Sequence, residues 1–432
     1  MERTLTAELY KWKVLKDRKP LLLKGVRQSG KTYLLKEFGR QAYADTAYFN
    51  FEGNEPLQRC FERDLDPKRI MVELGVLHRR AIKPGETLII FDEIQFCNRA
   101  LTALKYFYEE APHYHIACAG SLLGVALSKP LSFPVGKVDL RVLRPLSFYE
   151  FARANGEGDI LDFMSGPGRG KPVPDAFTGR LEDLLSAYYI AGGMPEAAAR
   201  WVENRDVSEV EAVQRRILDS YELDFAKHAP VSDIPKLGLI WKSIPSQLAR
   251  ENGKFVFGHA RPGARAKDLE DALEWLIAAG LAHKVAKIEK PFVPLSAYAD
   301  QSYFKLYAAD VGLLRKMAGL PADAVREGVE SYREFKGALA ENFALTELLN
   351  AGFDTPFYWR SSNTAEVDFV VQYNGGIVPV EVKAGRNRAR SLAEYRKRFA
   401  PKVSVKASLE NIGGAEVKSV PLYMLWRLKD HI

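Results

Sequence analysis

Residues 19–37 read KPLLLKGVRQSGKTYLLKE, and this stretch decides the fold of the first part of the chain. An apolar run at 21–23 leads into GVRQSGKT at 25–32, and a helical pattern of apolar residues follows. Strand, then GxxxxGK[ST], then helix is the context in which this pattern forms a phosphate-binding loop. Glycines let the backbone wrap a phosphate, and the amides at the start of the helix direct positive partial charge toward it. The stretch therefore predicts a nucleotide site in an α/β domain.

Each part of this loop has an expected task. Lys31 would reach the β- and γ-phosphates of ATP, and the Thr32 hydroxyl would bind Mg²⁺. A glycine turn before an ordinary helix is the alternative interpretation. The predicted nucleotide-binding residues are Gly25, Val26, Arg27, Gln28, Ser29, Gly30, Lys31 and Thr32.

A second motif, TLIIFDE at residues 87–93, supplies the acids that such a loop needs. A continuous apolar run is typical of a central parallel strand, and ligands bind at the carboxyl ends of such strands. We expect Asp92 to hold the Mg²⁺ shell and Glu93 to orient and deprotonate the attacking water. A solvated strand end is the alternative for this acidic pair.

Further polar groups follow the next predicted strand, residues 115–119. Ser121 is the candidate sensor of the γ-phosphate, with simple helix capping as the alternative. Lys137, Arg141 and Arg144 are candidates for a cation that stabilises the transition state, in cis or from a neighbouring subunit. The sequence does not choose among them.

Length and composition restrict the class of protein. A chain of 432 residues is too long for one core and suggests two to four domains. Its 47% hydrophobic and 27% charged residues are typical of a soluble globular protein, and no apolar run approaches the length of a membrane span. Three scattered cysteines and a charged N-terminus indicate the cytoplasm, without structural zinc. The net charge of +7 permits contact with nucleic acid but does not require it.

The motifs KGVRQSGKT, TLIIFDEIQ, CAGS and RPLSFYEF together resemble the prokaryotic AAA-type ATPases that carry a domain of unknown function, DUF4143. YYIAGGMPE at 188–196 and FKLYAADVGLL at 304–314 continue the resemblance. It implies an AAA-like parallel sheet, binding and hydrolysis of ATP, and an arginine after the glycine that matches Gly136. This chain has Lys137 there, which weakens an arginine-finger role at that position.

The middle of the chain reads as mainly helical. Residues 165–174 are rich in glycine and proline and predict a surface loop, and residues 207–225 predict a long helix. Residues 237–288 suit a winged helix with a short helix at 246–252, an amphipathic helix at 267–279 and a strand at 281–288. The second helix is acidic, so packing is favoured over DNA contact.

The C-terminal part holds a second set of chemical groups. Glu341 lies on a predicted helix, and Asp368 and Glu381 lie on two of three predicted strands, with Lys383 two residues further on. This order resembles the PD-(D/E)xK nuclease fold, although Val367 stands where the motif has proline. The resemblance implies an Mg²⁺ site of Glu341, Asp368 and Glu381, with Lys383 orienting water or neutralising charge. An inert domain kept for binding is the alternative.

Basic residues cluster after this motif and could follow a phosphate backbone. They are Lys383, Arg386, Arg388, Arg390, Arg396, Lys397, Arg398, Lys402 and Lys406. The predicted architecture is an α/β P-loop ATPase domain at 1–155, a helical and winged-helix-like domain at 175–320 and a nuclease-like domain at 330–432, with the DUF4143 region at about 190–432.

Two functions are consistent with this organisation. The first is ATP hydrolysis with Mg²⁺ coupled to binding or cleavage of DNA, or of another nucleic acid. The second is an ATP-dependent regulatory switch whose nuclease-like domain cleaves nothing. Association of the chain into a homo-oligomer stays open in both cases.

Overall fold

The computed structural model describes residues 1–121, 123–127, 136–250, 253–327, 333–361, 365–386 and 389–432. The chain divides into two compact units. One contains residues 2–144 together with 278–280, and the other contains residues 145–277 and 281–432. Arg388 and residues 128–135 lie outside the described residues.

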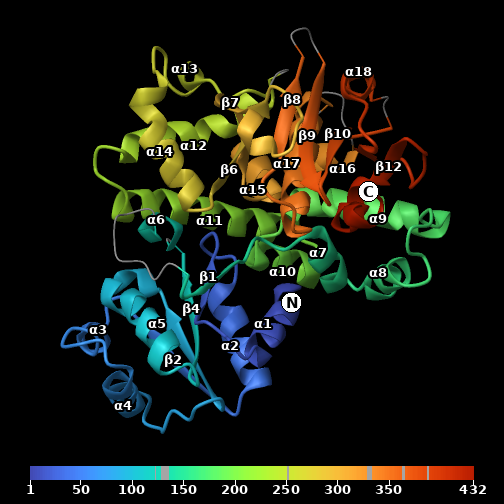
Figure 1. Ribbon diagram of the computed structural model, residues 1–432. Coiled ribbons are helices and arrows are strands. Elements are labelled where there is room, and N and C mark those ends of the chain that lie inside the picture. The colour runs from blue at the N-terminus through green and yellow to red at the C-terminus, as the bar shows by residue number, and fades with distance from the viewer. Residues whose placement is uncertain (122, 128–135, 251–252, 328–332, 362–364, 387–388) are drawn as a thin grey trace. The chain divides into compact units, whose positions relative to one another are not determined.

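The first unit is built on a parallel five-stranded sheet with the order β2-β3-β4-β1-β5 (Figure 1). Non-consecutive neighbours in this order require helical crossovers, as in other doubly wound sheets. The strands are β1 (Leu21–Lys24), β2 (Asp45–Asn50), β3 (Thr87–Asp92), β4 (His115–Gly120) and β5 (Asp139–Val142). The helices are α1 (Leu5–Val14), α2 (Lys31–Ala42), α3 (Glu55–Arg59), α4 (Pro67–His78), the 3₁₀ turn η1 (Ile94–Phe96), α5 (Asn98–Glu110) and α6 (Leu123–Leu127).

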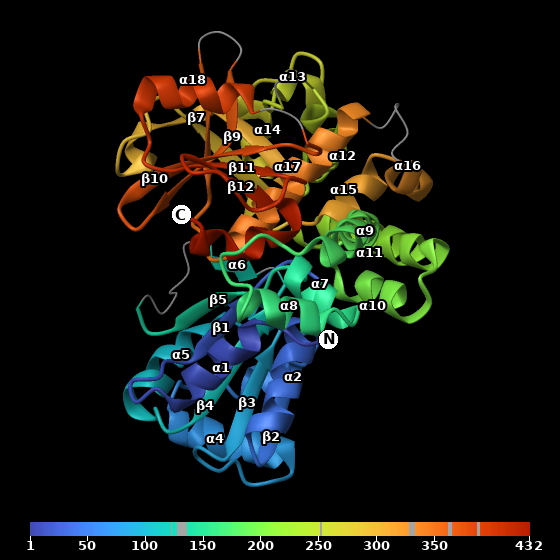
Figure 2. The same ribbon diagram turned by 90° about the vertical axis from the view of Figure 1, so that its right-hand side faces the viewer.

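Helices cover both faces of this sheet (Figure 2). Leu88 and Ile90 of β3 pack with α1 and α2, whereas Ile89 and Phe91 pack with α4 and α5. Alternate residues of a strand point to opposite faces, so β3 must be apolar throughout to be buried on both. The predicted α/β sheet is confirmed, and its edge strand β5 is an addition that the sequence analysis did not contain.

The second unit begins with helices. They are α7 (Phe148–Ala154), α8 (Gly158–Ser165), α9 (Asp175–Ala191), α10 (Pro195–Asn204), α11 (Val207–His228), α12 (Ile234–Leu248), α13 (Phe257–Ala260), α14 (Ala266–Ala278), α15 (Val311–Met317), α16 (Ala322–Glu327) and α17 (Arg333–Asn350). The predicted loop at 165–174 lies between α8 and α9, and the predicted long helix is α11. Residues 246–248 differ from the prediction because they end α12, which continues through Pro245, instead of starting a short helix.

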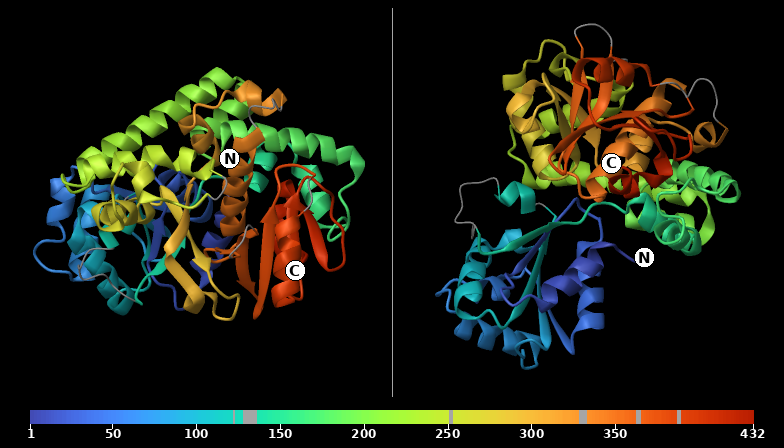
Figure 3. Two further views of the ribbon diagram at one scale, coloured as in Figure 1. Left: turned by 90° about the horizontal axis from the view of Figure 1, so that it is seen from above. Right: turned by 45° about the vertical axis from the view of Figure 1, so that its right-hand side comes forward.

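A mixed seven-stranded sheet completes this unit, in the order β12-β11-β10-β9-β8-β6-β7. Its strands are β6 (Ala282–Ile288), β7 (Ala299–Ala308), β8 (Phe357–Arg360), β9 (Glu366–Tyr373), β10 (Gly376–Val382), β11 (Ser404–Ser408) and β12 (Val417–Pro421). The 3₁₀ segments η2 (Leu295–Tyr298) and η4 (Leu422–Asp430) and helix α18 (Arg390–Phe399) complete the unit. Figure 3 shows α18 beside β9 and β10, which it contacts.

This sheet joins two stretches that the sequence analysis placed in different domains. β6 and β7 come from the predicted middle domain, and β6 pairs with β8 of the predicted C-terminal domain. β6 and β7 are therefore part of the larger sheet and do not form the separate wing of a winged helix. Among the described residues, no helix has the length and apolar character needed to cross a bilayer.

Candidate functional site

The predicted phosphate loop connects β1 to α2, and its two glycines are required by the backbone. A Cβ on Gly25 would lie 2.1 Å from the Leu143 carbonyl oxygen, and Gly30 has φ +91°, in the region that favours glycine. The buried Lys31 ammonium donates to the carbonyl oxygens of Gly25 (2.8 Å) and Val26 (2.9 Å). Burial lowers the pKa of Lys31 to about 8, and Glu93 and Asp92 partly offset this effect. The loop thus holds a cation at its centre.

Arg3 supports this loop from outside the motif. Its guanidinium donates to the Ser29 carbonyl oxygen at 3.1 Å and to the Arg144 carbonyl oxygen at 2.5 Å. Arg3 therefore ties the phosphate loop to the chain that follows β5. The sequence analysis did not find this contact, because nothing in the pattern around Arg3 points to a partner so far along the chain.

Asp92, at the end of β3, is joined to the loop. Its Oδ2 accepts hydrogen bonds from the Thr32 hydroxyl and the Tyr48 hydroxyl, each at 2.8 Å. The register between β2 and β3 pairs Tyr48 with Ile90, two residues before Asp92 on the same face of β3. Thr32 and Asp92, both predicted as Mg²⁺ ligands, are therefore together, and Tyr48 is an additional partner that the sequence analysis missed.

Glu93 follows directly and has φ +50°, a left-handed conformation that is uncommon outside glycine. Its carboxylate accepts from the Ser121 hydroxyl at 3.1 Å, from the Ser121 amide at 3.3 Å and from the Gln95 side chain. A Cβ on Gly120 would lie 2.1 Å from the Gln95 Oε1, so the glycine leaves room for this contact. Ser121 and Glu93, predicted separately, thus form one hydrogen-bonded group.

The candidate cations after β4 make other contacts. Lys137 pairs with Glu109 at 2.9 Å and Arg141 pairs with Glu8 at 3.3 Å. Burial lowers the pKa of Arg144. Lys137 and Arg141 are therefore engaged by carboxylates outside the phosphate loop.

The predicted C-terminal site contains a lysine that the sequence analysis did not assign. Lys305 of β7 pairs with Glu341 of α17 at 3.1 Å and with Glu366 of β9 at 2.6 Å. Asp368 Oδ2 accepts from the Val382 amide at 2.7 Å. Burial raises the pKa of the Asp368 carboxyl well above its ordinary value, and Glu341 adds to this effect.

Glu381 and Lys383 pair with each other at 2.8 Å, and Glu381 also accepts from the Leu392 amide at the start of α18. Among the described residues, no group of three or more His, Cys, Asp or Glu side chains is arranged to hold a metal ion. The predicted Mg²⁺ trio of Glu341, Asp368 and Glu381 is therefore not formed. Lysine ammonium groups and backbone amides bond to at least one carboxylate oxygen of each of these three acids.

The basic residues around α18 divide into paired and exposed groups. Arg386 pairs with Glu182, Arg396 with Glu416 and Lys406 with Glu410. Arg390, Lys397 and Lys402 are exposed, and no ion pair joins them to another described residue.

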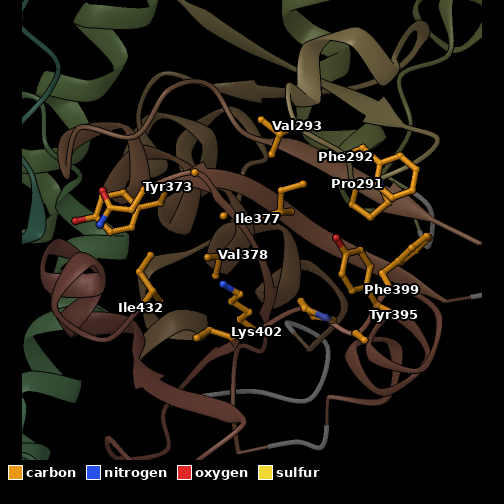
Figure 4. A pocket seen from close by; sticks show the side chains of 16 residues that line it. Pro291, Phe292, Val293, Tyr373, Ile377, Val378, Tyr395, Phe399, Lys402 and Ile432 are labelled. Atoms are coloured by element: carbon orange, nitrogen blue, oxygen red, sulfur yellow. The ribbon is translucent and has the colours of Figure 1, made fainter.

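Lys402 lies at the rim of a hollow of about 510 Å³ between the β9–β10 turn and the end of α18. Figure 4 shows Phe292 and Phe399 on one side of the hollow and Tyr373 on the other. Phe292 is 50% exposed, so part of an aromatic ring faces solvent here. The hollow therefore combines aromatic surface with a nearby positive charge.

Comparisons with protein families agree with this architecture. Residues 17–152 match the model described as AAA domain, residues 182–324 match a domain of unknown function, DUF8612, and residues 336–425 match a domain of unknown function, DUF4143. The chain carries an AAA domain and a DUF4143 domain. The five-stranded parallel sheet of the AAA domain is that of a P-loop NTPase.

Several solved structures are similar to this chain at low sequence identity, and no curated protein matches. A Walker-type ATPase of Pyrococcus abyssi is 15% identical, with a TM-score of 0.43 over 73% of this chain and 95% of that chain. The Orc1 protein of Aeropyrum pernix, in complex with DNA, is 13% identical, with a TM-score of 0.30 over 75% and 94%. AMPPCP-bound DnaA of Aquifex aeolicus is 11% identical, with a TM-score of 0.30 over 64% and 89%. The assignment of the AAA and DUF4143 domains rests on the family models.

Proposed function

We propose that the AAA domain binds ATP with Mg²⁺ and hydrolyses it. The observation that supports this most strongly is the Thr32–Asp92 hydrogen bond of 2.8 Å beside the buried Lys31 ammonium. Hydroxyl and carboxylate oxygens are ligands that Mg²⁺ accepts, and phosphates and waters complete its shell in such sites. The residues present therefore fit an Mg²⁺–ATP complex.

In this proposal each residue has one task. Lys31 exchanges its bonds to the loop carbonyls for bonds to the β- and γ-phosphates. Bound Mg²⁺ supplies positive charge next to the phosphate oxygens. Glu93 accepts a proton from the attacking water, and Ser121 donates to the γ-phosphate once it leaves Glu93. Because Lys137 and Arg141 are paired elsewhere, a cation from a second copy of the chain would complete the site in a homo-oligomer.

Substitution of Lys31 tests the proposal. Lys31→Ala removes the ammonium, so ATP affinity measured by calorimetry with Mg²⁺ should fall by at least about a hundredfold, with turnover lost. Lys68→Ala, on the exposed surface of α4, is the control and should bind ATP like the wild type. Unchanged ATP affinity and turnover in Lys31→Ala would remove the assignment.

We further propose that the second unit contacts nucleic acid through the exposed basic side chains in and just after α18 and through the aromatic hollow. Lys397 and Lys402 would meet phosphates, and Phe292 offers a ring on which an unpaired base can stack. Fluorescence anisotropy with labelled single-stranded DNA at two salt concentrations tests this. A Lys397→Ala, Lys402→Ala double variant should bind more weakly and with a shallower salt dependence than the wild type, and Lys68→Ala should not.

The second candidate function, an ATP-dependent switch with an inert nuclease-like domain, is favoured by the occupied carboxylates of Glu341 and Glu381. Turnover of ATP with and without DNA separates the two. Stimulation by DNA supports coupling to nucleic acid, and equal rates support the switch. In both cases we propose a cytoplasmic protein, as the cysteine usage suggests.

A further inference from the structure

Lys305 lies among the carboxylates of the DUF4143 region in an unusual environment. Its side chain is 2% exposed, and its ammonium contacts Glu341 at 3.1 Å and Glu366 at 2.6 Å. Tyr307, two residues further along β7, donates to the same Glu341 oxygen at 3.0 Å. An ammonium buried this deeply is stable only when acids surround it, because desolvation of a lone charge is costly.

The remaining acids are also engaged. Asp368 accepts from the Val382 amide and Glu381 from the Leu392 amide, each at 2.7 Å. Glu381 also pairs with Lys383. An Mg²⁺ ion demands nearly octahedral oxygen coordination at about 2.1 Å, and these oxygens are already directed at nitrogen donors.

The charges of this group nearly balance without a metal. Glu341, Glu366 and Glu381 face three cations, which are Lys305, Lys383 and Arg360, the last 3.7 Å from Glu366. With Asp368 as the fourth acid, a divalent ion added to this group would leave an excess of positive charge in a buried site.

We propose that Lys305 is the resident cation of this carboxylate group and takes the position that a divalent metal would need. It follows that removal of the Lys305 charge lets a divalent ion take its place against Glu341 and Glu366, with the neighbouring Asp368 carboxylate turning toward it to complete the site. The proposal is independent of ATP hydrolysis by the AAA domain, since no residue of the phosphate loop takes part in it.

The test measures Mn²⁺ binding to the full chain by the electron paramagnetic resonance signal of free Mn²⁺, without nucleotide. Lys305→Met keeps the length of the side chain and removes its charge, and it should bind one additional Mn²⁺ per chain, at least about tenfold more tightly than any site in the wild type. Asp368→Asn added to Lys305→Met should remove that site. Lys383→Met is the matched control, because Lys383 is 29% exposed and pairs with Glu381, and it should gain no such site.

Folding of the variant is checked by circular dichroism and by ATP binding. If Lys305→Met is destabilised, millimolar Mn²⁺ should raise its melting temperature and leave that of the wild type unchanged, because a ligand stabilises only the state that binds it. A folded Lys305→Met chain without the additional site would overturn the proposal. So would an Mn²⁺ site in the wild type that Asp368→Asn removes, and this second result decides the question even if Lys305→Met does not fold.

Discussion

At the scale of single residues, the AAA domain holds its predicted catalytic acid in a hydrogen-bonded group. The Glu93 carboxylate accepts from Ser121 at 3.1 Å and from Gln95, while its backbone is left-handed. These donors occupy the Glu93 carboxylate oxygens, so Glu93 must lose some of these bonds before it can contact the attacking water.

Substitution of Ser121 distinguishes its two expected tasks. If Ser121 donates to the γ-phosphate, Ser121→Ala should lower kcat by roughly ten- to a hundredfold with little change in KM, because a transition-state donor is lost. Gln95→Ala is the matched control, since it removes the other side-chain donor to Glu93. Steady-state ATP turnover checks both variants, and a Ser121→Ala rate equal to or above that of the wild type would mean that Ser121 only restrains Glu93.

At the scale of elements, Asp310 connects two motifs of the family resemblance. Its Oδ1 accepts from the Leu313 amide at the start of α15, and its Oδ2 accepts from the Gly193 amide at 2.6 Å. A Cβ on Gly192, which has φ +72°, would lie 2.2 Å from Asp310 Oδ1. The stretches around Gly192 and Asp310 therefore pack closely against each other at the C-terminal end of α9.

Removal of this carboxylate should destabilise the second unit. Asp310→Ala loses a helix cap and leaves the Gly193 amide buried without its partner, at a cost of about 2–4 kcal/mol of unfolding free energy. Asp310→Asn keeps one acceptor oxygen and should cost less. Urea unfolding followed by tryptophan fluorescence measures both, and equal stability of Asp310→Ala and the wild type would contradict this account.

Glu347 of α17 gives the same unit a pH dependence. It is fully buried and accepts from the Phe148 amide of α7 at 2.9 Å, and burial raises its pKa to about 8 from an ordinary value of 4.5. The folded chain thus keeps a proton that the unfolded chain releases near its ordinary pKa. The contribution of Glu347 to the unfolding free energy is fully present below its ordinary pKa of 4.5. It falls by roughly 1.4 kcal/mol per pH unit as the pH rises from there toward about 8.

Glu347→Gln cannot ionise, so its unfolding free energy should lack this decline between about pH 5 and pH 8. Urea unfolding at several pH values compares the two slopes. Parallel curves for Glu347→Gln and the wild type would show that Glu347 does not titrate in this range.

At the scale of the whole chain, the two sets of acids should act separately. Asp368→Ala removes an acid of the DUF4143 region and should leave ATP turnover within about twofold of the wild type, because Asp368 is not part of the phosphate loop. With Lys305 in place, supercoiled plasmid should remain intact with Mg²⁺ and ATP for both proteins. Mg²⁺-dependent nicking by the wild type that Asp368→Ala abolishes would restore the nuclease hypothesis.

Local pattern was enough to predict much of this architecture. The phosphate loop between β1 and α2, the apolar strand β3 and the helix around Glu341 each follow from residues close together in sequence. β5, β7, β11 and β12 were missed. β5 and β12 are short and only partly buried, and β7 and β11 contain lysines such as Lys305 and Lys406 that interrupt the apolar run expected of a strand.

Local sequence is sufficient to specify the strand–loop–helix that can cradle phosphates and the acidic pair at the end of β3, because each depends on neighbouring residues. The partners of those residues become known only from the folded chain. Tyr48 on Asp92, Arg3 on Ser29 and Lys305 between Glu341 and Glu366 are contacts between distant parts of the chain. A carboxylate in a motif can hold a metal or a lysine equally well, and the choice depends on which cation the folded chain brings to it.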